Sequence, residues 1–159
     1  MLPQVNETAA GRAEREDLAQ AIARIERLGK SLFGVTACIV QLHGADEVLA
    51  ETAFASPAHR FCAGLPLGEA LQLMPEKASP FSPALGKIDN FEIRFYALQP
   101  LHDRAGNVVG RVGLLHERTR AFTSGDGHWM SDLTALIERE LHFSGFVAAV
   151  SRPGSVPEN

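Results

Sequence analysis

The first part of the chain repeats apolar residues at steps of three and four. Between Ala10 and Phe33 these residues fall on one stripe of a helix, while charged side chains occupy the other faces. Gly34 then ends the pattern. We therefore predict an amphipathic helix over 10–33, with this apolar stripe: Leu18, Ile22, Ile25, Leu28 and Leu32.

Two strands are predicted next. The segment "VTACIVQLHG" (35–44) is apolar at nearly every position, which is typical of a strand covered on both faces. After a turn at 44–46, "DEVLAETAF" (46–54) favours a second strand.

The middle of the chain, 55–92, is the least periodic part. Pro75, Pro80 and Pro83 exclude a helix through this region, because each proline ring removes an amide donor and clashes with the preceding turn. A short strand is predicted at 71–74, followed by a loop or a single helical turn over 78–87.

The stretch "RFYALQPLHDRAGNVVGRVGLLHE" (94–117) predicts a β-hairpin. Two apolar segments flank "DRAGN", in which glycine and asparagine favour a tight turn. Gly110 and Gly113 lie inside the returning strand, which indicates a bulge or the close approach of another backbone.

A second helix is predicted near the end of the chain. Thr123 or Ser124 would cap it, with Asp126 completing a capping box. Its stripe is Trp129, Met130, Leu133, Leu136, Ile137, Glu140 and Leu141. Antiparallel strands between two terminal helices predict the α+β class.

Composition narrows the classes of function. The chain has 159 residues, 45% of them hydrophobic, and a net charge of −4, which suits one globular domain. It has no basic tract, so we expect no nucleic-acid partner. No apolar run approaches the roughly 20 residues that span a bilayer, and the N-terminus does not read as a signal peptide. Two cysteines in different contexts imply no disulfide framework, so we expect a cytoplasmic protein.

Motifs for catalysis and metal binding are absent from the sequence. It contains no G-x-S-x-G, H-E-x-x-H, P-loop or G-x-G-x-x-G motif, so we predict no catalytic residues and no enzyme activity. His59 and Cys62 have a ligand-like spacing, but no second pair completes a four-ligand site, so no metal is predicted.

Three pieces of the chain carry a resemblance to a family. "IRFYALQPLHDRAGNVVGRVGLLHE", "HRFCAG" (59–64) and "LQLMPEKASPFSPALGK" (71–87) resemble, in order and spacing, the GAF domain of bacterial signalling proteins. The resemblance covers roughly 15–143. It implies a central antiparallel sheet, with the terminal helices on one face and a ligand pocket on the other.

The same resemblance implies partners. Such domains commonly lie upstream of diguanylate cyclase, phosphodiesterase or kinase modules, and often dimerise through their end helices. From the pattern along the chain, we predict a flexible tail (1–9), a sensory domain (10–145) and a tail or linker (146–159). Leu98, Gly113 and His116 depart from the family wording, so no particular ligand is carried over and the cofactor stays unknown.

We predict a non-catalytic sensory domain that binds a small molecule and relays the signal through its terminal helices. Arg94, Arg111, Tyr96 and Gln99 are candidates for polar contacts, although ordinary core and solvated strand edges are alternative placements. The predicted ligand-binding residues are Phe61, Cys62, Leu73, Phe81, Phe91, Arg94, Tyr96 and Leu98.

Two alternatives stay open at this point. One is a dimerisation module whose pocket is filled by its own side chains. The other is a redox sensor or enzyme that depends on Cys62, with His59 and Arg60 nearby to lower the pKa of its thiol. The predicted dimer interface is Leu18, Ile22, Ile25, Leu133 and Leu136.

Overall fold

The computed structural model describes residues 9–43, 56–77, 79–88 and 91–145. The strand predicted at 46–54, residues 1–8 of the tail predicted at 1–9, and the tail or linker at 146–159 lie outside the described residues, whereas Ala9 is the first residue of α1. The elements are α1 (Ala9–Phe33), β1 (Ala37–Leu42), α3 (Pro57–Ala63), β2 (Gln72–Met74), β3 (Gly86–Ile88), β4 (Phe91–Ile93), β5 (Phe95–His102), β6 (Val108–His116) and α4 (Ser124–Ser144).

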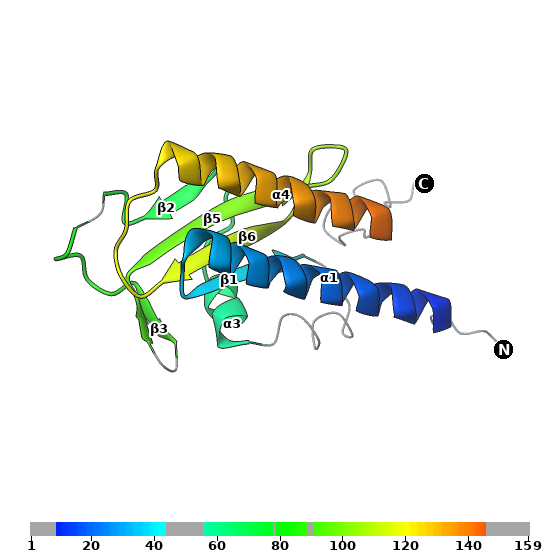
Figure 1. Ribbon diagram of the computed structural model, residues 1–159, viewed down its shortest axis with the longest axis horizontal. Helices are drawn as coiled ribbons and strands as arrows, with labels where there is room; N and C mark the ends of the chain where they lie inside the picture. The colour runs from blue at the N-terminus through cyan, green and yellow to red at the C-terminus, as the bar shows by residue number, and fades with distance from the viewer. Residues whose placement is uncertain (1–8, 44–55, 78, 89–90, 146–159) are drawn as a thin grey trace, which may run out of the picture.

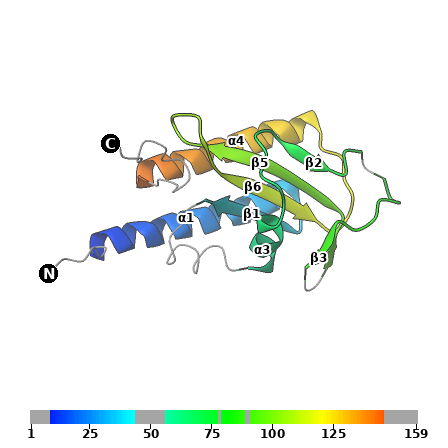
Figure 2. The same ribbon diagram turned by 180° about the vertical axis from the view of Figure 1, so that it is seen from behind.

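The centre of the molecule is a four-stranded sheet in the order β1-β6-β5-β2, with every neighbouring pair antiparallel. Figure 2 shows the β5–β6 hairpin at its middle. The predicted hairpin and short strand are therefore confirmed. The hairpin turn spans 103–107: the Oδ1 atom of Asp103 accepts hydrogen bonds from the backbone N–H groups of Ala105 and Asn107, and Gly106 has φ +92°.

The two glycines in β6 allow close packing on both sides of that strand. A Cβ atom on Gly110 would lie 2.2 Å from the carbonyl oxygen of Gln41 in β1. On Gly113 it would lie 3.0 Å from Leu98 and 3.3 Å from the sulfur of Cys62. The predicted close approach of another backbone is confirmed at Gly110, whereas Gly113 is approached by side chains.

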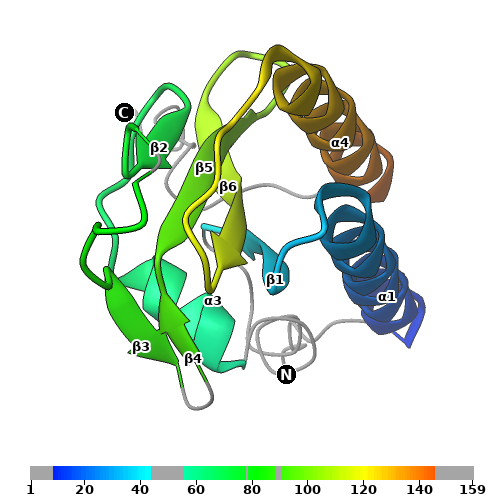
Figure 3. The ribbon, with the colours of Figure 1, turned by 60° about the vertical axis from the view of Figure 1, so that its left-hand side comes forward.

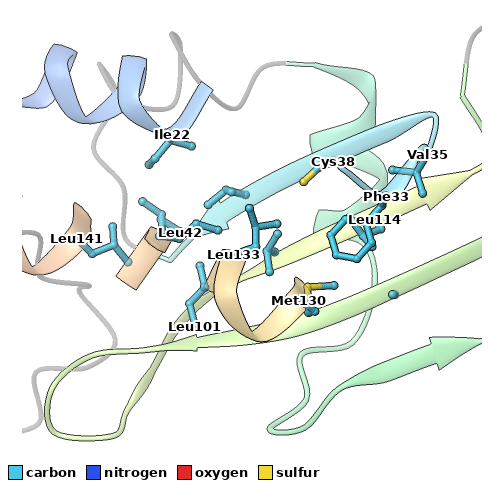
Figure 4. Close-up of a cluster of buried hydrophobic side chains, with 14 of the residues drawn as sticks. Ile22, Phe33, Val35, Cys38, Leu42, Leu101, Leu114, Met130, Leu133 and Leu141 are labelled. Carbon is cyan, nitrogen blue, oxygen red and sulfur yellow. The ribbon is translucent and has the colours of Figure 1, made fainter. Parts of the chain in front are cut away.

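Helices α1 and α4 lie side by side on one face of the sheet (Figures 1 and 3). Their apolar stripes meet the helix-facing side chains of β1, β5 and β6, as the close-up in Figure 4 shows. Burial of this surface is the main contribution to the stability of the fold. Members of this helix-side core include Ile22, Phe33, Cys38, Leu101, Leu114, Met130, Leu133 and Leu141.

Three residues of the predicted dimer interface lie in the core of the single chain. Leu18, Ile22 and Leu133 are at most 5% exposed, because they pack into this core. Ile25 is partly buried against the core, and only Leu136 is well exposed, at 45%. A helix packed on its own sheet needs the same apolar periodicity as a helix in a dimer seam, so the sequence pattern did not separate the two.

The boundaries of the long helices follow their sequence signals. Thr123 is the N-cap of α4, and its hydroxyl and the Asp126 carboxylate form the predicted capping box. Gly34 and Gly145, both with positive φ, follow the last turns of α1 and α4.

The opposite face of the sheet carries α3 and the small β3–β4 sheet (Figure 3). Neither was predicted, although α3 has a local signal: Ser56 caps it and Pro57 occupies its first turn. The α+β prediction is confirmed, with two terminal helices on one face of an antiparallel sheet. Within the described part of the chain, no helix is long and apolar enough to cross a membrane.

Candidate functional site

The face opposite the long helices holds a second apolar cluster, between the sheet and α3. Five of the eight predicted ligand-binding residues meet there: Cys62 and Leu98 are buried, while Phe61, Phe91 and Tyr96 are partly buried. The rings of Phe61 and Tyr96 pack edge to face, with centroids 6.3 Å apart. The other fully buried members are Ile39, Ile93 and Leu115. The space under α3 is thus filled by the protein's own side chains.

Three predicted site residues lie apart from this cluster. Leu73 packs against the helix-side core, and Phe81 is 90% exposed on the turn that follows Pro80. Arg94 is on the surface, where it donates to the Ser82 carbonyl and pairs with Glu92 at 2.6 Å. Because its side chain is almost fully exposed, Phe81 does not line this cluster.

Arg111 is the buried cation of this face. It projects from β6 towards α3 and is only 5% exposed. Its guanidinium donates to the carbonyl oxygens of Cys62, Leu65 and Pro66, and to the Oε1 atom of Gln41 at 3.0 Å. These carbonyls belong to the last turn of α3 and the residues after it, where a cation is favourable. Arg111 therefore holds the C-terminal end of α3 on the sheet.

The start of α3 is held by a second polar group. The Nε2 atom of His59 lies 2.8 Å from the Oε2 atom of Glu26, and the Nδ1 atom of the same ring contacts the Ser56 hydroxyl. The same Glu26 oxygen accepts from the backbone N–H of Val40, at 2.7 Å. Since Glu26 is on α1 and His59 on α3, this contact links the two faces of the sheet. The residues are 33 positions apart, and no local sequence pattern predicts their pairing.

The sequence did offer a signal for Arg111. One charged residue interrupts "VVGRVGLL", an otherwise apolar strand, which indicates a polar contact or a solvated strand edge. The structure places it inward, but in contact with backbone carbonyls of α3.

Cys62 lacks the solvent access and the low pKa of a reactive thiol. It is fully buried, and burial raises its pKa to about 12, although the nearby Arg111 acts in the opposite direction. Reactive cysteines have lowered pKa values and are reached by solvent. Cys38, in the helix-side core, has its pKa raised in the same way by burial and by Glu26.

An open groove of about 460 Å³ lies where β2 meets β5, next to the filled cluster. Its walls are mostly apolar, with the Tyr96 phenol, the Gln72 amide and the Glu76 carboxylate as polar groups. Burial, together with Cys62, raises the pKa of Tyr96, so its hydroxyl stays a hydrogen-bond donor at neutral pH. The lining residues are Pro66, Leu71, Gln72, Leu73, Met74, Glu76 and Tyr96. Of the predicted site residues, Leu73 and Tyr96 line this groove.

No group of three or more His, Cys, Asp or Glu side chains suited to a metal ion occurs among the described residues. The His59 ring nitrogens are instead directed at Ser56 and Glu26. The structure therefore offers a groove and polar links between elements as its candidate functional features.

Comparisons with known proteins find similarity among solved structures only. No protein-family model and no curated protein matches the chain. Among solved structures, the chain is similar to the blue-light absorbing form of the Thermosynechococcus elongatus PixJ GAF-domain, with 15% identity and a TM-score of 0.49. The match covers 92% of this chain and 98% of that chain. A similarity at this level carries neither ligand nor chemistry to this protein.

Proposed function

We propose that this protein is a non-catalytic sensory domain that binds a small molecule in the groove beside Tyr96 and passes the signal to α1. One observation supports this proposal above others: hydrogen bonds form a continuous path from the groove wall to α1. Such a path gives a ligand a physical means to act on a distant helix.

The path begins at Pro66, which lines the groove and accepts a hydrogen bond from Arg111 at 2.8 Å. Arg111 also holds the end of α3, and His59 at the start of α3 contacts Glu26 of α1. A ligand that moves 64–66 would therefore shift α3, and through Glu26 it would shift α1. It acts only if it binds the two arrangements with different affinity.

The groove suits a compact ligand with an apolar body. Its walls supply aliphatic side chains, a thioether and an aromatic ring, with few polar groups to fix orientation, as in other small-molecule sites. We propose that the output belongs to a diguanylate cyclase, phosphodiesterase or kinase module on the same or another chain. We also propose that the domain acts in the cytoplasm of a bacterium.

Native mass spectrometry of the purified protein tests ligand binding first. A mass excess that disappears on denaturation supports the proposal and gives the ligand's mass. Thermal shift against a metabolite library then identifies binders, because only a binder stabilises the folded state. Failure to find any ligand whose effect is lost in Tyr96→Ala would contradict the groove assignment.

Hydrogen exchange tests the path to α1. In Glu26→Gln, addition of the identified ligand should no longer change exchange in α1, while binding itself should persist. Glu16→Gln, an exposed residue of the same helix, is the matched control and should behave as wild type. Equal ligand responses in both variants would contradict the relay.

A second candidate function is a dimerisation module, favoured by the filled space under α3. Apolar side chains remain exposed on the long helices: Leu28 (49%) and Leu32 (37%) on α1, and Trp129 (49%) and Leu136 (45%) on α4. Trp129 and Leu136 are one heptad apart and so share a helix face. We propose that this set, the helix-pair surface, is the dimer contact in place of the buried stripe.

A further inference from the structure

The turn at 79–82 holds an aromatic side chain out in solvent. It lies in the segment between β2 and β3, which extends away from the central sheet at one end of the molecule (Figure 1). Phe81 is 90% exposed, more than any other large apolar side chain of the described residues. An aromatic ring buries about 150–250 Å² when it packs against a partner, and nearly all of this area is unused in the single chain.

Hydrogen bonds fix the backbone of this turn. The Ser79 hydroxyl accepts from the N–H of Phe81 at 3.2 Å, and the Ser79 carbonyl oxygen accepts from the N–H of Ser82 at 3.1 Å. Pro80 occupies the second position of the turn, where its restricted φ is favourable. The Arg94 guanidinium donates to the Ser82 carbonyl oxygen at 3.1 Å. The backbone that carries the ring is thus set before a partner binds, which lowers the entropic cost of association.

The groove between β2 and β5 suits a ring of this kind. It is open and mostly apolar, and its volume of about 460 Å³ accommodates a phenyl ring, which is smaller than most ligands of small-molecule sites. Leu71, Leu73 and Met74 supply aliphatic contacts, and Tyr96 supplies an aromatic neighbour.

The charges beside the two surfaces differ in sign. Between residues 64 and 88 the chain has four charged side chains, all of them exposed. Glu76 lines the groove and Glu69 lies shortly before β2, whereas Lys77 and Lys87 flank the turn in the sequence. A turn seated in the groove of another molecule would bring the lysines towards the glutamates.

We propose that Phe81 inserts into the groove of a second copy of this chain, and that the two copies exchange these turns about a two-fold axis. The hydrogen bond from Arg94 to Ser82 holds the turn away from its own groove, so the ring that fills the groove comes from another molecule. Since turn and groove belong to one stretch of the chain, both contacts form in the same closed dimer. Phe81 is then a contact residue, and Arg94 is a positioning residue for the turn.

Photo-crosslinking of the ligand-free protein tests the contact. The chain with p-benzoylphenylalanine in place of Phe81 is prepared in ¹⁴N and ¹⁵N forms, which are mixed in equal amounts and irradiated. We expect cross-links from position 81 to 71–76 or to Tyr96, with mixed-isotope pairs among them. Cross-links confined to pairs of one isotope, or directed to other parts of the chain, would overturn the exchange between copies.

Sedimentation equilibrium measures the strength of the association. The parent is ligand-free Leu136→Glu, so that the helix-pair surface does not contribute. In this parent, Phe81→Ser should weaken association by roughly tenfold or more. Phe143→Ser, which removes another exposed phenylalanine, is the matched control and should associate as the parent does. Equal association of the two variants, or a parent that stays monomeric at about 1 mM, would overturn the proposal.

A variant of the groove tests the receiving side. Leu71 lines the groove and is 37% exposed, so Leu71→Arg should fold while its bulk and positive charge oppose entry of the turn. Association in the same parent should fall as it does in Phe81→Ser, and unchanged association would overturn the groove as the receiving site.

The dimer and the small-molecule proposal concern the same groove but fail separately. Association is measured without ligand, so the absence of a retained ligand in native mass spectrometry bears on the small molecule alone. If a ligand does bind, it competes with Phe81 of the second copy and should dissociate the dimer, a consequence that rests on the proposed function. Phe81→Ser keeps the groove intact and should bind that ligand at least as well as wild type, and weaker binding would overturn the competition.

Discussion

Arg111 is the residue on which the face opposite the long helices most depends. Its guanidinium donates hydrogen bonds to three backbone carbonyl oxygens near the end of α3. Burial lowers its pKa, and its partners are neutral carbonyl and amide oxygens. Replacement by an apolar residue of similar length leaves those oxygens unpaired in a buried environment.

Arg111→Met should therefore lower the free energy of unfolding by about 2–4 kcal/mol. Urea denaturation measures this change, and Arg94→Met is the control, because Arg94 is 36% exposed on its side chain and should cost less than about 1 kcal/mol. Equal effects of the two substitutions would show that the hydrogen bonds to α3 contribute little.

Cys62 is expected to be unreactive in the folded protein. Its thiol is buried and its pKa is raised to about 12, so very little thiolate is present at pH 8 and reagents have no access to it. Alkylation by iodoacetamide, followed by peptide mass spectrometry, should modify Cys62 at least 100-fold more slowly in the native state than in urea. Rapid native modification would revive the redox hypothesis.

At the scale of elements, His116 links the end of β6 to the segment between α1 and β1. Its Nδ1 atom accepts a hydrogen bond from the backbone N–H of Thr36 at 3.1 Å, so this nitrogen must be unprotonated. Burial, and then the positive charge of Arg120, lowers the pKa of His116 below its ordinary value of 6.5. The unfolded chain therefore takes up a proton at a higher pH than the folded chain does.

The free energy of unfolding should accordingly fall as pH drops below 6.5, and the His116 contribution should be fully present above that pH. Denaturation between about pH 7 and pH 5 measures the slope. His116→Gln keeps an acceptor for the Thr36 N–H and should make the slope of stability against pH shallower. Part of the slope that remains should come from His43, because burial lowers the pKa of that residue as well. The exposed His128→Gln is the control, and the same slope in both variants would contradict this assignment.

At the scale of the whole molecule, α1 and α4 have two roles that need different residues. Their inner stripes close the core, and their outer side leaves the helix-pair surface exposed. If that surface forms a dimer, Leu136→Glu should yield monomers in light scattering while the melting temperature of the monomer changes little. Leu133→Ala should instead cost about 2–5 kcal/mol of stability, because it opens a cavity in the core. A wild-type protein that stays monomeric at high concentration would contradict the dimer.

Periodicity along the chain by itself determined the long elements. The stripe of α1, the alternation and turn of the β5–β6 hairpin, and the capping box of α4 are local signals, because hydrogen bonding and burial within such elements depend on residues close in sequence. Those elements were predicted, together with the α+β class. The helix α3 also had a local signal in Ser56 and Pro57, but proline-rich surroundings obscured it.

Tertiary structure alone decided which side chains meet. The side of the sheet that Arg111 faces, the pairing of Glu26 with His59, and the burial of Leu133 but not Leu136 all depend on segments far apart in sequence. A sequence pattern states that a residue is apolar or charged, but burial and hydrogen bonding are properties of a pair of surfaces. They exist only once the sheet, α3 and the long helices have packed together.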